Sequence, residues 1–210
     1  MRKENKIASI IAHYETCLEK HGDSHLGVDW PNKNDAEKRY QVMLEIIKDL
    51  DATGASLLDF GCGAGHLLTY LEGHPIPNIR YTGLDISKKF ISLCHSKFPD
   101  AQFLCADVLA EMNIMEDYDY VVMNGVFTEK RNLTFDEMFN YFQKLIVATF
   151  ANTKKGLAFN VMSKQVDWER ADLFHLPLDV LASFLVQKIS RNFVIRNDYG
   201  LYEYTTYIYR

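Results

Sequence analysis

The residues best suited to chemistry form a short stretch, LLDFGCGAGHL, at positions 57–67. Within it Asp59 is followed by Gly61, Gly63 and Gly65, which are separated from one another by single residues. Closely spaced glycines let the backbone turn sharply and approach a ligand without interfering side chains. The pattern predicts a nucleotide-binding turn between a strand that ends near Asp59 and the helix that follows.

The type of nucleotide depends on two residues around the glycines. The dinucleotide fingerprint requires glycine at its first, third and sixth positions, which here are Gly61, Gly63 and His66. His66 breaks that fingerprint. A carboxylate at Asp59 would also face a negatively charged pyrophosphate. Both residues disfavour an NAD(P)-dependent oxidoreductase, which stays an alternative, and Asp59 suits a cationic ligand better.

Two more acidic residues follow predicted strands. Asp85 ends the run YTGLD, 24 residues after Gly61, and Asp107 follows the run FLCA. A carboxylate can accept two hydrogen bonds from a ribose diol, and charged hydrogen bonds are worth about 1.5–3 kcal/mol each. Three acidic residues at three successive strand ends are a more specific signal than the glycines alone.

With these residues in place, LLDFGCGAGHL resembles motif I of the class I S-adenosylmethionine (SAM) dependent methyltransferases, in which an acidic residue precedes G-x-G-x-G. The resemblance implies SAM as cofactor, with Asp59 suited to its positive charges, Asp85 holding both ribose hydroxyls and Asp107 contacting the adenine amino group. It implies a wider cofactor site at and beside these strand ends, made of Cys62, Ile86, Ala106, Val108, Asn124 and Gly125 in addition to the acids and glycines.

The chain from about Tyr14 to Arg210 also resembles a set of poorly characterised bacterial methyltransferases. The similarity rests on LGVDW near the N-terminus, NGVF after the fourth strand and DYGLYEYTTYIY at the end. The chain departs from that set by Asp29, inserted between Val28 and Trp30, and by Asn124 in place of a serine. The resemblance supports the fold and cofactor but leaves the methyl acceptor open.

Within this interpretation the segment HGDSHLGVDW, residues 21–30, is expected to fold over the cofactor as a lid. Trp30 would then cap the site, and Arg39 would pair with the SAM carboxylate. Simple packing of Trp30 and a solvent-exposed helix face for Arg39 are the alternatives.

Methyl transfer mainly requires alignment of donor and acceptor and exclusion of water. If the acceptor must lose a proton, His25 and His175 are candidate bases near neutral pH, with structural roles as the alternative. The alternating C-terminal tyrosines indicate a strand covered on both faces, although Tyr199 and Tyr202 could instead line an aromatic substrate pocket.

The strands and helices that position these residues are predicted from the spacing of apolar residues along the chain. Strands are expected near 56–60, 81–85, 101–107, 119–124 and 156–163, and helices near 64–73, 87–97, 134–151 and 178–188. Two β-rich runs around NDYG predict a closing antiparallel pair. Two helices, one from Ile7 and one from about Asp35 to Leu50, precede the first strand with a loop between them.

Together these elements predict an α/β fold: a Rossmann-like, doubly wound sheet of seven strands, mostly parallel, with an antiparallel last strand. The 210 residues are expected to form a single domain, with a helical lid at 1–53 and a SAM-binding core at 54–210.

Composition restricts location and partners. The net charge is −5, and no basic run offers the stripe that nucleic acids require. No signal peptide and no run of about 18 apolar residues is visible, which predicts a cytoplasmic protein that does not bind membranes. The four cysteines are scattered, so reduced thiols and no metal site are expected.

The class of acceptor is narrowed by what the motifs lack. The strand end NGVF has neither proline of the DNA amino-methylase motif, no proline precedes a cysteine as cytosine C5 methylation requires, and only Glu129 could serve a catechol-type magnesium site. A bacterial enzyme that methylates a small molecule, as a monomer or homodimer, is the prediction. A non-catalytic module that binds SAM or S-adenosylhomocysteine (SAH) is the alternative from another class.

Overall fold

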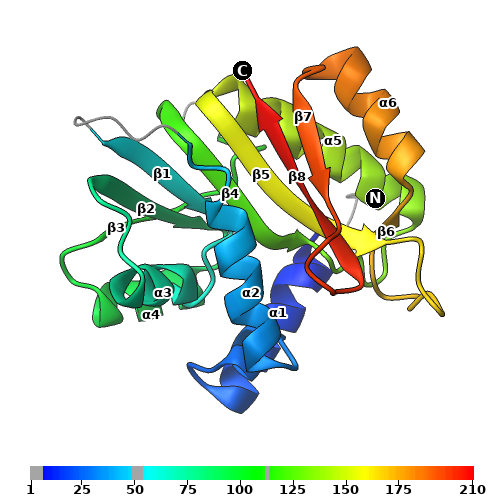
Figure 1. The fold of residues 1–210 in the computed structure, drawn as a ribbon. Helices are drawn as coiled ribbons and strands as arrows, with labels where there is room; N and C mark the ends of the chain where they lie inside the picture. The colour runs from blue at the N-terminus through cyan, green and yellow to red at the C-terminus, as the bar shows by residue number, and fades with distance from the viewer. Residues whose placement is uncertain (1–6, 49–53, 112–113) are drawn as a thin grey trace.

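The computed structural model describes residues 7–48, 54–111 and 114–210, which form one mixed sheet between two layers of helices (Figure 1). The helices are α1 (Ala8–His21), the 3-10 helix η1 (His25–Val28), α2 (Lys33–Leu44), α3 (His66–Gly73), α4 (Lys88–Lys97), α5 (Phe135–Ala151) and α6 (Leu178–Lys188). The strands are β1 (Ala55–Phe60), β2 (Ile79–Asp85), β3 (Gln102–Cys105), β4 (Tyr118–Phe127), β5 (Thr153–Ser163), β6 (His175–Leu176), β7 (Phe193–Arg196) and β8 (Glu203–Tyr209).

The strand order β3-β2-β1-β4-β5-β8-β7 is that of a doubly wound sheet. Strands β1 to β5 are parallel, so their carboxyl ends meet at one edge of the sheet. β8 runs antiparallel to both β5 and β7 and lies between them. The predicted parallel core and antiparallel last strand are confirmed. The sheet has eight strands rather than the predicted seven. The additional strand, β6, has two residues that pair with the end of β5, and it is too short to be recognised in the sequence.

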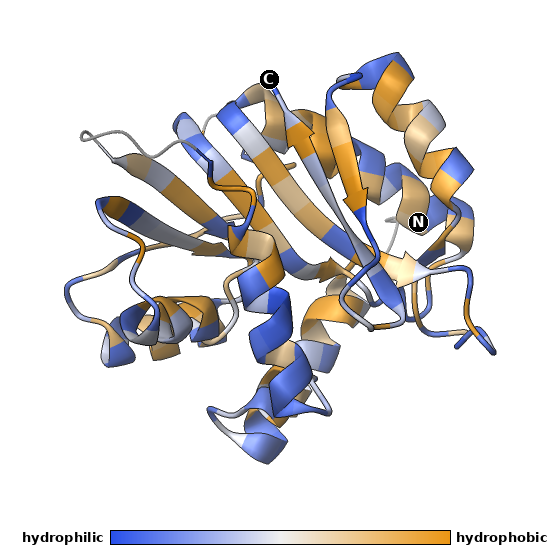
Figure 2. Cartoon of the chain, viewed as in Figure 1, coloured by the Kyte–Doolittle hydropathy of each residue, from blue (hydrophilic) through white to orange (hydrophobic). Residues whose placement is uncertain are grey.

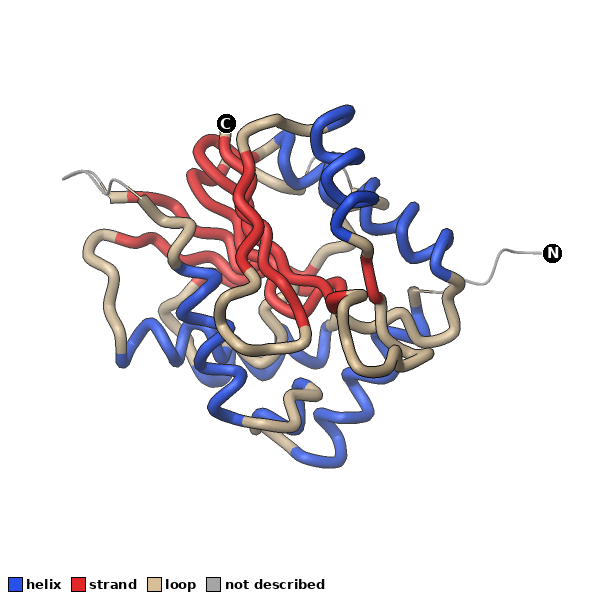
Figure 3. Tube along the Cα trace, turned by 45° about the vertical axis from the view of Figure 1, so that its right-hand side comes forward, coloured by secondary structure: helices blue, strands red, loops and turns tan. Residues whose placement is uncertain are grey.

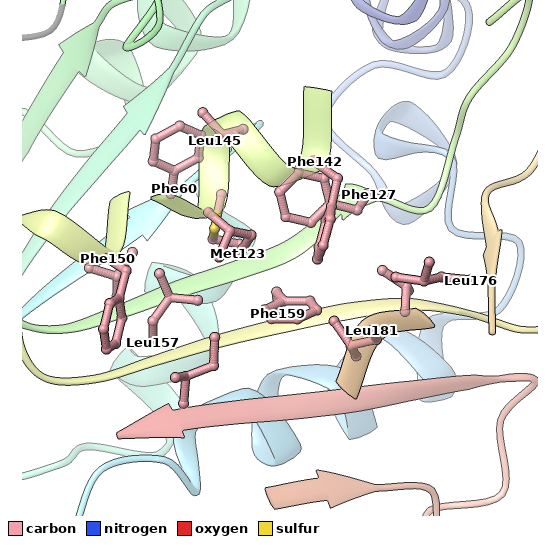
Figure 4. Close-up of a cluster of buried hydrophobic side chains, with 14 of the residues drawn as sticks. Phe60, Met123, Phe127, Phe142, Leu145, Phe150, Leu157, Phe159, Leu176 and Leu181 are labelled. Atoms are coloured by element: carbon pink, nitrogen blue, oxygen red, sulfur yellow. The ribbon is translucent and has the colours of Figure 1, made fainter. Parts of the chain in front are cut away.

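Both faces of the sheet are buried by amphipathic helices. On one face α5 and α6 cover alternate strand residues, and Figure 4 shows Phe142 of α5 packed toward Phe127 and Phe159 of the sheet. The centroids of the Phe127 and Phe142 rings lie 4.8 Å apart. On the other face α2 and α3 cover the intervening residues of β1, β4, β5 and β8, while α4 packs toward β2 and β3. The apolar colour of the strands in Figure 2 matches this double coverage.

The last strand illustrates why the C-terminal tyrosines alternate. Tyr204 and Ile208 point into the cluster beneath α5 and α6, whereas Tyr207 points into the cluster beneath α2. A strand covered on both faces therefore explains the pattern. Tyr199 is buried and bonds to Thr205, whereas Tyr202 is 64% exposed, so the two do not form the aromatic pocket considered as an alternative.

The N-terminal segment lies across the edge where the parallel strands end. In Figures 1 and 3, α1 and the start of α2 lie beside the carboxyl ends of the strands, with η1 in the connection between them. The predicted 21–30 loop thus contains a short helix, and α2 ends at Leu44 rather than at Leu50, which lies outside the described residues. None of the described helices has the length and apolar character to cross a membrane.

Candidate cofactor and active site

A pocket opens at the carboxyl edge of the sheet, beneath α1 and residues 28–30. Most of the residues predicted to bind the cofactor line it. They are Asp59, Gly61, Cys62, Gly63, Asp85, Ile86, Ala106, Asp107, Val108, Asn124, Gly125 and Trp30. The topology therefore brings together residues from four strand ends and the lid. The two that are farthest apart in the sequence, Trp30 and Gly125, are separated by 95 positions.

The turn after β1 depends on Gly61. Its φ of 74° lies in the left-handed region, and a Cβ there would approach Cγ2 of Val126 to 2.6 Å. The Gly61 and Cys62 N–H groups both donate to the carbonyl oxygen of Leu84, at 2.7 and 3.0 Å, which fixes the turn against β2. Only glycine combines this conformation with this close approach. Gly65, the third glycine of the motif, is the N-cap of α3 and does not line the pocket.

Asp85 joins the glycine turn to the end of β2. One carboxylate oxygen accepts from the Gly63 N–H at 2.9 Å, and the other accepts from the Ser87 N–H at 2.8 Å. Each oxygen has a second lone pair available to a ligand. Burial raises the pKa of Asp85, while the backbone N–H groups of Ser87, Gly63 and Ile86 act in the opposite direction. This carboxylate is thus rigidly held, which suits it to grip a ribose diol.

Asp59 lies deeper and has fewer partners. Its side chain is 3% exposed and accepts a 2.7 Å hydrogen bond from the Tyr81 hydroxyl. Burial raises the pKa of Asp59 to about 7; the Tyr81 bond opposes the shift, and the nearby charge of Asp85 adds to it. Two carboxylates that repel each other in an apolar pocket are stabilised by a cation between them. The arrangement fits a positively charged ligand.

The third acidic residue, Asp107, follows β3 and accepts a hydrogen bond from the Leu109 N–H at 3.1 Å. The wall near it includes Tyr141 of α5, a residue that sequence reasoning missed. Burial raises the pKa of Tyr141, and the charges of Asp107 and Asp85 raise it further. Tyr141 is therefore a neutral hydrogen-bonding group near these acids.

The end of β4 contributes an unpaired hydrogen-bond acceptor, at Asn124, and a glycine, Gly125, against which the Trp30 ring packs. Among the residues that the structure describes, Oδ1 of Asn124 is buried without a hydrogen-bond partner although Asn124 lines the pocket. Gly125 has a φ of 80°, and a Cβ at this position would lie 2.7 Å from the Trp30 ring. A buried acceptor without a donor costs free energy until a ligand supplies one. A ligand N–H or ammonium would satisfy it.

The lid packs directly on the glycine motif. Trp30 lies against Gly125, and Val28 lies 3.4 Å from the position of a Cβ on Gly63. Asp23 ties residues 21–30 to the core through His66 Nε2 at 2.8 Å and Lys97 Nζ at 2.8 Å. The segment predicted to form the lid thus lies beside the pocket, and the role of Trp30 as a cap stays a prediction.

Arg39 does not occupy its predicted place at the cofactor. Its Nε donates to both carboxylate oxygens of Glu203 at 2.9 Å, and its guanidinium lies 4.1 Å from the centroid of the Trp30 ring. Glu203 is 1% exposed and also accepts from Asn160 Nδ2, while Asn160 Oδ1 accepts from the Gly125 N–H at 2.8 Å. Because Arg39 is outside the pocket lining and committed to Glu203, we correct the prediction: Arg39 supports Trp30 rather than the SAM carboxylate.

The two candidate histidine bases lie outside the pocket. His25 Nδ1 donates to the Trp30 carbonyl at 2.6 Å, which shapes the lid. His175 is 6% exposed; its Nδ1 donates to the Ser163 carbonyl and its Nε2 accepts from the Arg170 N–H. With both ring nitrogens of His175 bonded to backbone, its predicted role as a base is wrong for this structure. His66 does line the pocket, but its Nε2 is bonded to Asp23.

Several pocket residues escaped sequence reasoning. Tyr14 of α1 lines the pocket and its hydroxyl donates to the Gly125 carbonyl at 3.4 Å. Ile10 and Ile11 of α1, together with Ile7 directly before the helix, form the rest of the pocket roof. Their helical spacing indicates a buried face but not what that face covers. Cys62 is a buried thiol whose pKa is raised by contact with the Cys94 thiol and by burial, which fits a filler rather than a nucleophile.

Comparison with known proteins agrees with this geometry. Residues 58–147 match a methyltransferase domain family. Rv1506c of Mycobacterium tuberculosis, a protein assigned as a methyltransferase, is 28% identical over 155 residues that cover 71% of this chain and 90% of that protein. These similarities confirm the predicted SAM-dependent methyltransferase. The predicted cofactor is therefore confirmed as SAM, and the oxidoreductase alternative is wrong.

Solved structures show the same fold for this methyltransferase. The magnesium protoporphyrin IX methyltransferase of Synechocystis PCC 6803 with bound SAM superimposes with a TM-score of 0.67 at 15% identity, over 100% of this chain and 99% of that one. The plantazolicin methyltransferase, in complex with a triazolic desmethylPZN analogue and SAH, gives a TM-score of 0.61 at 14% identity, over 99% of this chain and 91% of that one. Such low identities relate the folds and not the acceptors.

The pocket residues fit SAM. The glycine turn leaves room for the cofactor, Asp85 can hold the ribose, and Asp59 and the Asn124 amide oxygen match the cationic part of the molecule. When bound, SAM supplies an electrophilic methyl group. The protein's part is then to align that group with an acceptor and to exclude water.

Proposed function

We propose that this methyltransferase transfers the methyl group of SAM to a small molecule. The observation that carries the proposal is the roof of the pocket: Ile7, Ile10, Ile11 and Tyr14 lie over the edge of the sheet, beside the lid residues Val28 and Trp30. A roof at this position favours an acceptor that can be enclosed and disfavours a polymer.

The acceptor would enter beside Tyr14, Trp30 and Gly125. These residues come from α1, the lid and β4, and Tyr14 and Trp30 each lie against Gly125, so the three form a corner of the pocket. The names of two structural neighbours, for magnesium protoporphyrin IX and plantazolicin, also point to acceptors smaller than nucleic acid or protein. The net charge of −5 is a further argument against a nucleic-acid substrate.

The reaction would not depend on a free imidazole. Among histidines of the described chain, only His66 lines the pocket, and burial lowers its pKa while Asp23 holds its Nε2. The best acceptors would therefore carry a reactive lone pair near neutral pH without help from a base, as carboxylates and weakly basic amines do. In this scheme Asp85 and Asp59 bind and orient the donor, and Tyr14 and Trp30 exclude water.

The test is an acceptor screen in which SAH formation and the methylated product are both followed by mass spectrometry. Carboxylates, amines, phenols, thiols and sugars form the panel, and RNA and a protein mixture are included as polymers. Methylation of one small-molecule class that is lost in Asp85→Ala supports the proposal. Methylation of a polymer alone would contradict it, and tight SAH binding without turnover on any acceptor would favour the non-catalytic module.

A further inference from the structure

The structure brings three different metal-binding groups together on the side of α1 next to the lid. Nε2 of His13 lies 2.7 Å from Oδ2 of Asp29, and Sγ of Cys17 lies 3.9 Å from the same nitrogen. All three ligand atoms lie within 4.8 Å of one another. The sequence predicts no metal site, because the four cysteines are scattered. Asp29 lies 16 positions from His13 along the chain, and only the fold brings the two together.

Helical spacing pairs two of these residues. His13 and Cys17 are four positions apart on α1, so their side chains share one flank of the helix. Spacing of this kind lets two residues of one helix bind the same ion. The third residue, Asp29, follows η1 with a φ of 59°, an unusual left-handed conformation for a residue other than glycine, which directs its carboxylate toward His13.

We propose that His13, Cys17 and Asp29 bind a zinc ion that fastens α1 to the lid. Nitrogen, sulfur and oxygen ligands together are typical of zinc. Tetrahedral bonds of about 2.0–2.3 Å place ligand atoms roughly 3.3–3.6 Å apart, so the three atoms here need to move by less than about 1 Å. A thiolate, a carboxylate and a neutral imidazole also balance the two charges of the ion.

The position of this site connects it to the cofactor pocket. Tyr14, next to His13, lines the pocket, and so do Val28 and Trp30 on either side of Asp29. The rings of His13 and Tyr14 are in edge contact, with centroids 5.5 Å apart. A zinc ion would therefore hold the roof and the lid in the closed arrangement that the cofactor requires. Three protein ligands leave a fourth position for water.

The direct test uses chelator-treated protein without cofactor, so that it is independent of the acceptor proposal. Calorimetric titration with zinc chloride is expected to show one ion per chain, with affinity at least tenfold weaker in His13→Ala, Cys17→Ser and Asp29→Asn. Cobalt is expected to give a thiolate charge-transfer band in the near ultraviolet that Cys17→Ser abolishes. Cys105→Ser and His21→Gln are matched controls, since both residues lie outside the group.

A second readout tests the link to the lid. Zinc is expected to raise SAH affinity by roughly fivefold or more, and SAH is expected to raise zinc affinity by the same factor. Circular dichroism verifies that each variant is folded. Unchanged zinc affinity in all three variants, or no cobalt–thiolate band, would leave His13 and Asp29 as a simple ion pair and overturn the proposal. Stoichiometric zinc without any change in SAH affinity would overturn the fastening role.

Discussion

The cofactor half of the site and its roof are built in different ways. The glycine turn, Asp59, Asp85 and Asp107 follow successive strands. The hydrogen bonds from Gly63 to Asp85 and from Tyr81 to Asp59 each join residues 22 positions apart, and the bond from Leu109 to Asp107 joins residues two positions apart. The roof depends on contacts across the whole chain: Tyr14 bonds to Gly125 over 111 positions, and Arg39 bonds to Glu203 over 164. The cofactor half can therefore be recognised from a local sequence motif, whereas the contacts of the roof form only when distant parts of the chain come together.

The strongest test of this difference is Arg39→Ala. The substitution leaves Glu203, which is 1% exposed, without its cationic partner, and breaking a buried ion pair in this way costs about 3–5 kcal/mol of unfolding free energy. We expect a large fall in stability, measured by denaturant unfolding, and a secondary loss of SAM affinity through Trp30. Lys38→Ala, on an exposed neighbour in α2, is the control.

The opposite pattern would decide between the two roles of Arg39. Normal stability with a large loss of SAM affinity would mean that Arg39 pairs with the cofactor carboxylate, as the sequence suggested. The roof would then be less dependent on long-range contacts than the structure indicates.

A change of pH tests the cofactor half. Burial raises the pKa of Asp59 to about 7, and SAM, a cation, prefers the ionised carboxylate. SAM affinity is expected to fall below pH 7, by up to about tenfold per unit, when titrated between about pH 5.5 and 7.5. In Asp59→Asn the affinity is expected to be weaker and nearly independent of pH over this range. A wild-type profile as flat as that of the variant would contradict the role of Asp59.

The same carboxyl predicts the pH dependence of stability without cofactor. The folded protein keeps a proton on Asp59 that the unfolded chain has lost above its usual pKa near 4. The contribution of this group is thus fully present at low pH and is lost as pH rises toward 7. Asp59→Asn, compared with the wild type by thermal unfolding across this range, isolates that contribution.

The smallest effect is expected at the surface contact that ties the lid to the core. Asp23 pairs with Lys97 and His66, but its side chain is 37% exposed, and exposed ion pairs contribute about 0–1 kcal/mol. Asp23→Asn is expected to weaken SAH binding by no more than about fivefold, and the difference is expected to shrink at high salt. A larger loss, or one that salt does not affect, would show that Asp23 does more than close the lid.

The sequence predicted the cofactor half because local rules determine it. Short-range sequence patterns reveal the glycines with positive φ, the acidic residue at each strand end and the alternating apolar runs. The strand predicted near 101–107 contains only the four residues of β3. The chain leaves the sheet before Asp107, whose side chain accepts a hydrogen bond from the Leu109 N–H. Such differences affect boundaries and leave the arrangement of the acids unchanged.

The roof could not be predicted in the same way. The partner of Arg39 is Glu203, on a strand whose pairing with β5 is fixed only by the folded sheet. His175 was one of two candidate bases, and only the structure shows that backbone groups of Ser163 and Arg170 form hydrogen bonds with both of its nitrogens. The sequence carried one signal for the buried hydrogen bonds between Gly125, Asn160 and Glu203: Asn160 is a polar residue inside an apolar strand.

The pocket at the strand ends is expected to bind SAM through Asp85. Calorimetric titration with SAH is the most direct test, with NAD titrated alongside and Asp85→Ala and the exposed Asp100→Ala as variants. We expect the wild type and Asp100→Ala to bind SAH equally, Asp85→Ala to bind it at least about tenfold more weakly, and NAD to give no heat. Unchanged SAH affinity in folded Asp85→Ala would contradict the role of Asp85, and binding of NAD in place of SAH would contradict a SAM site in this pocket.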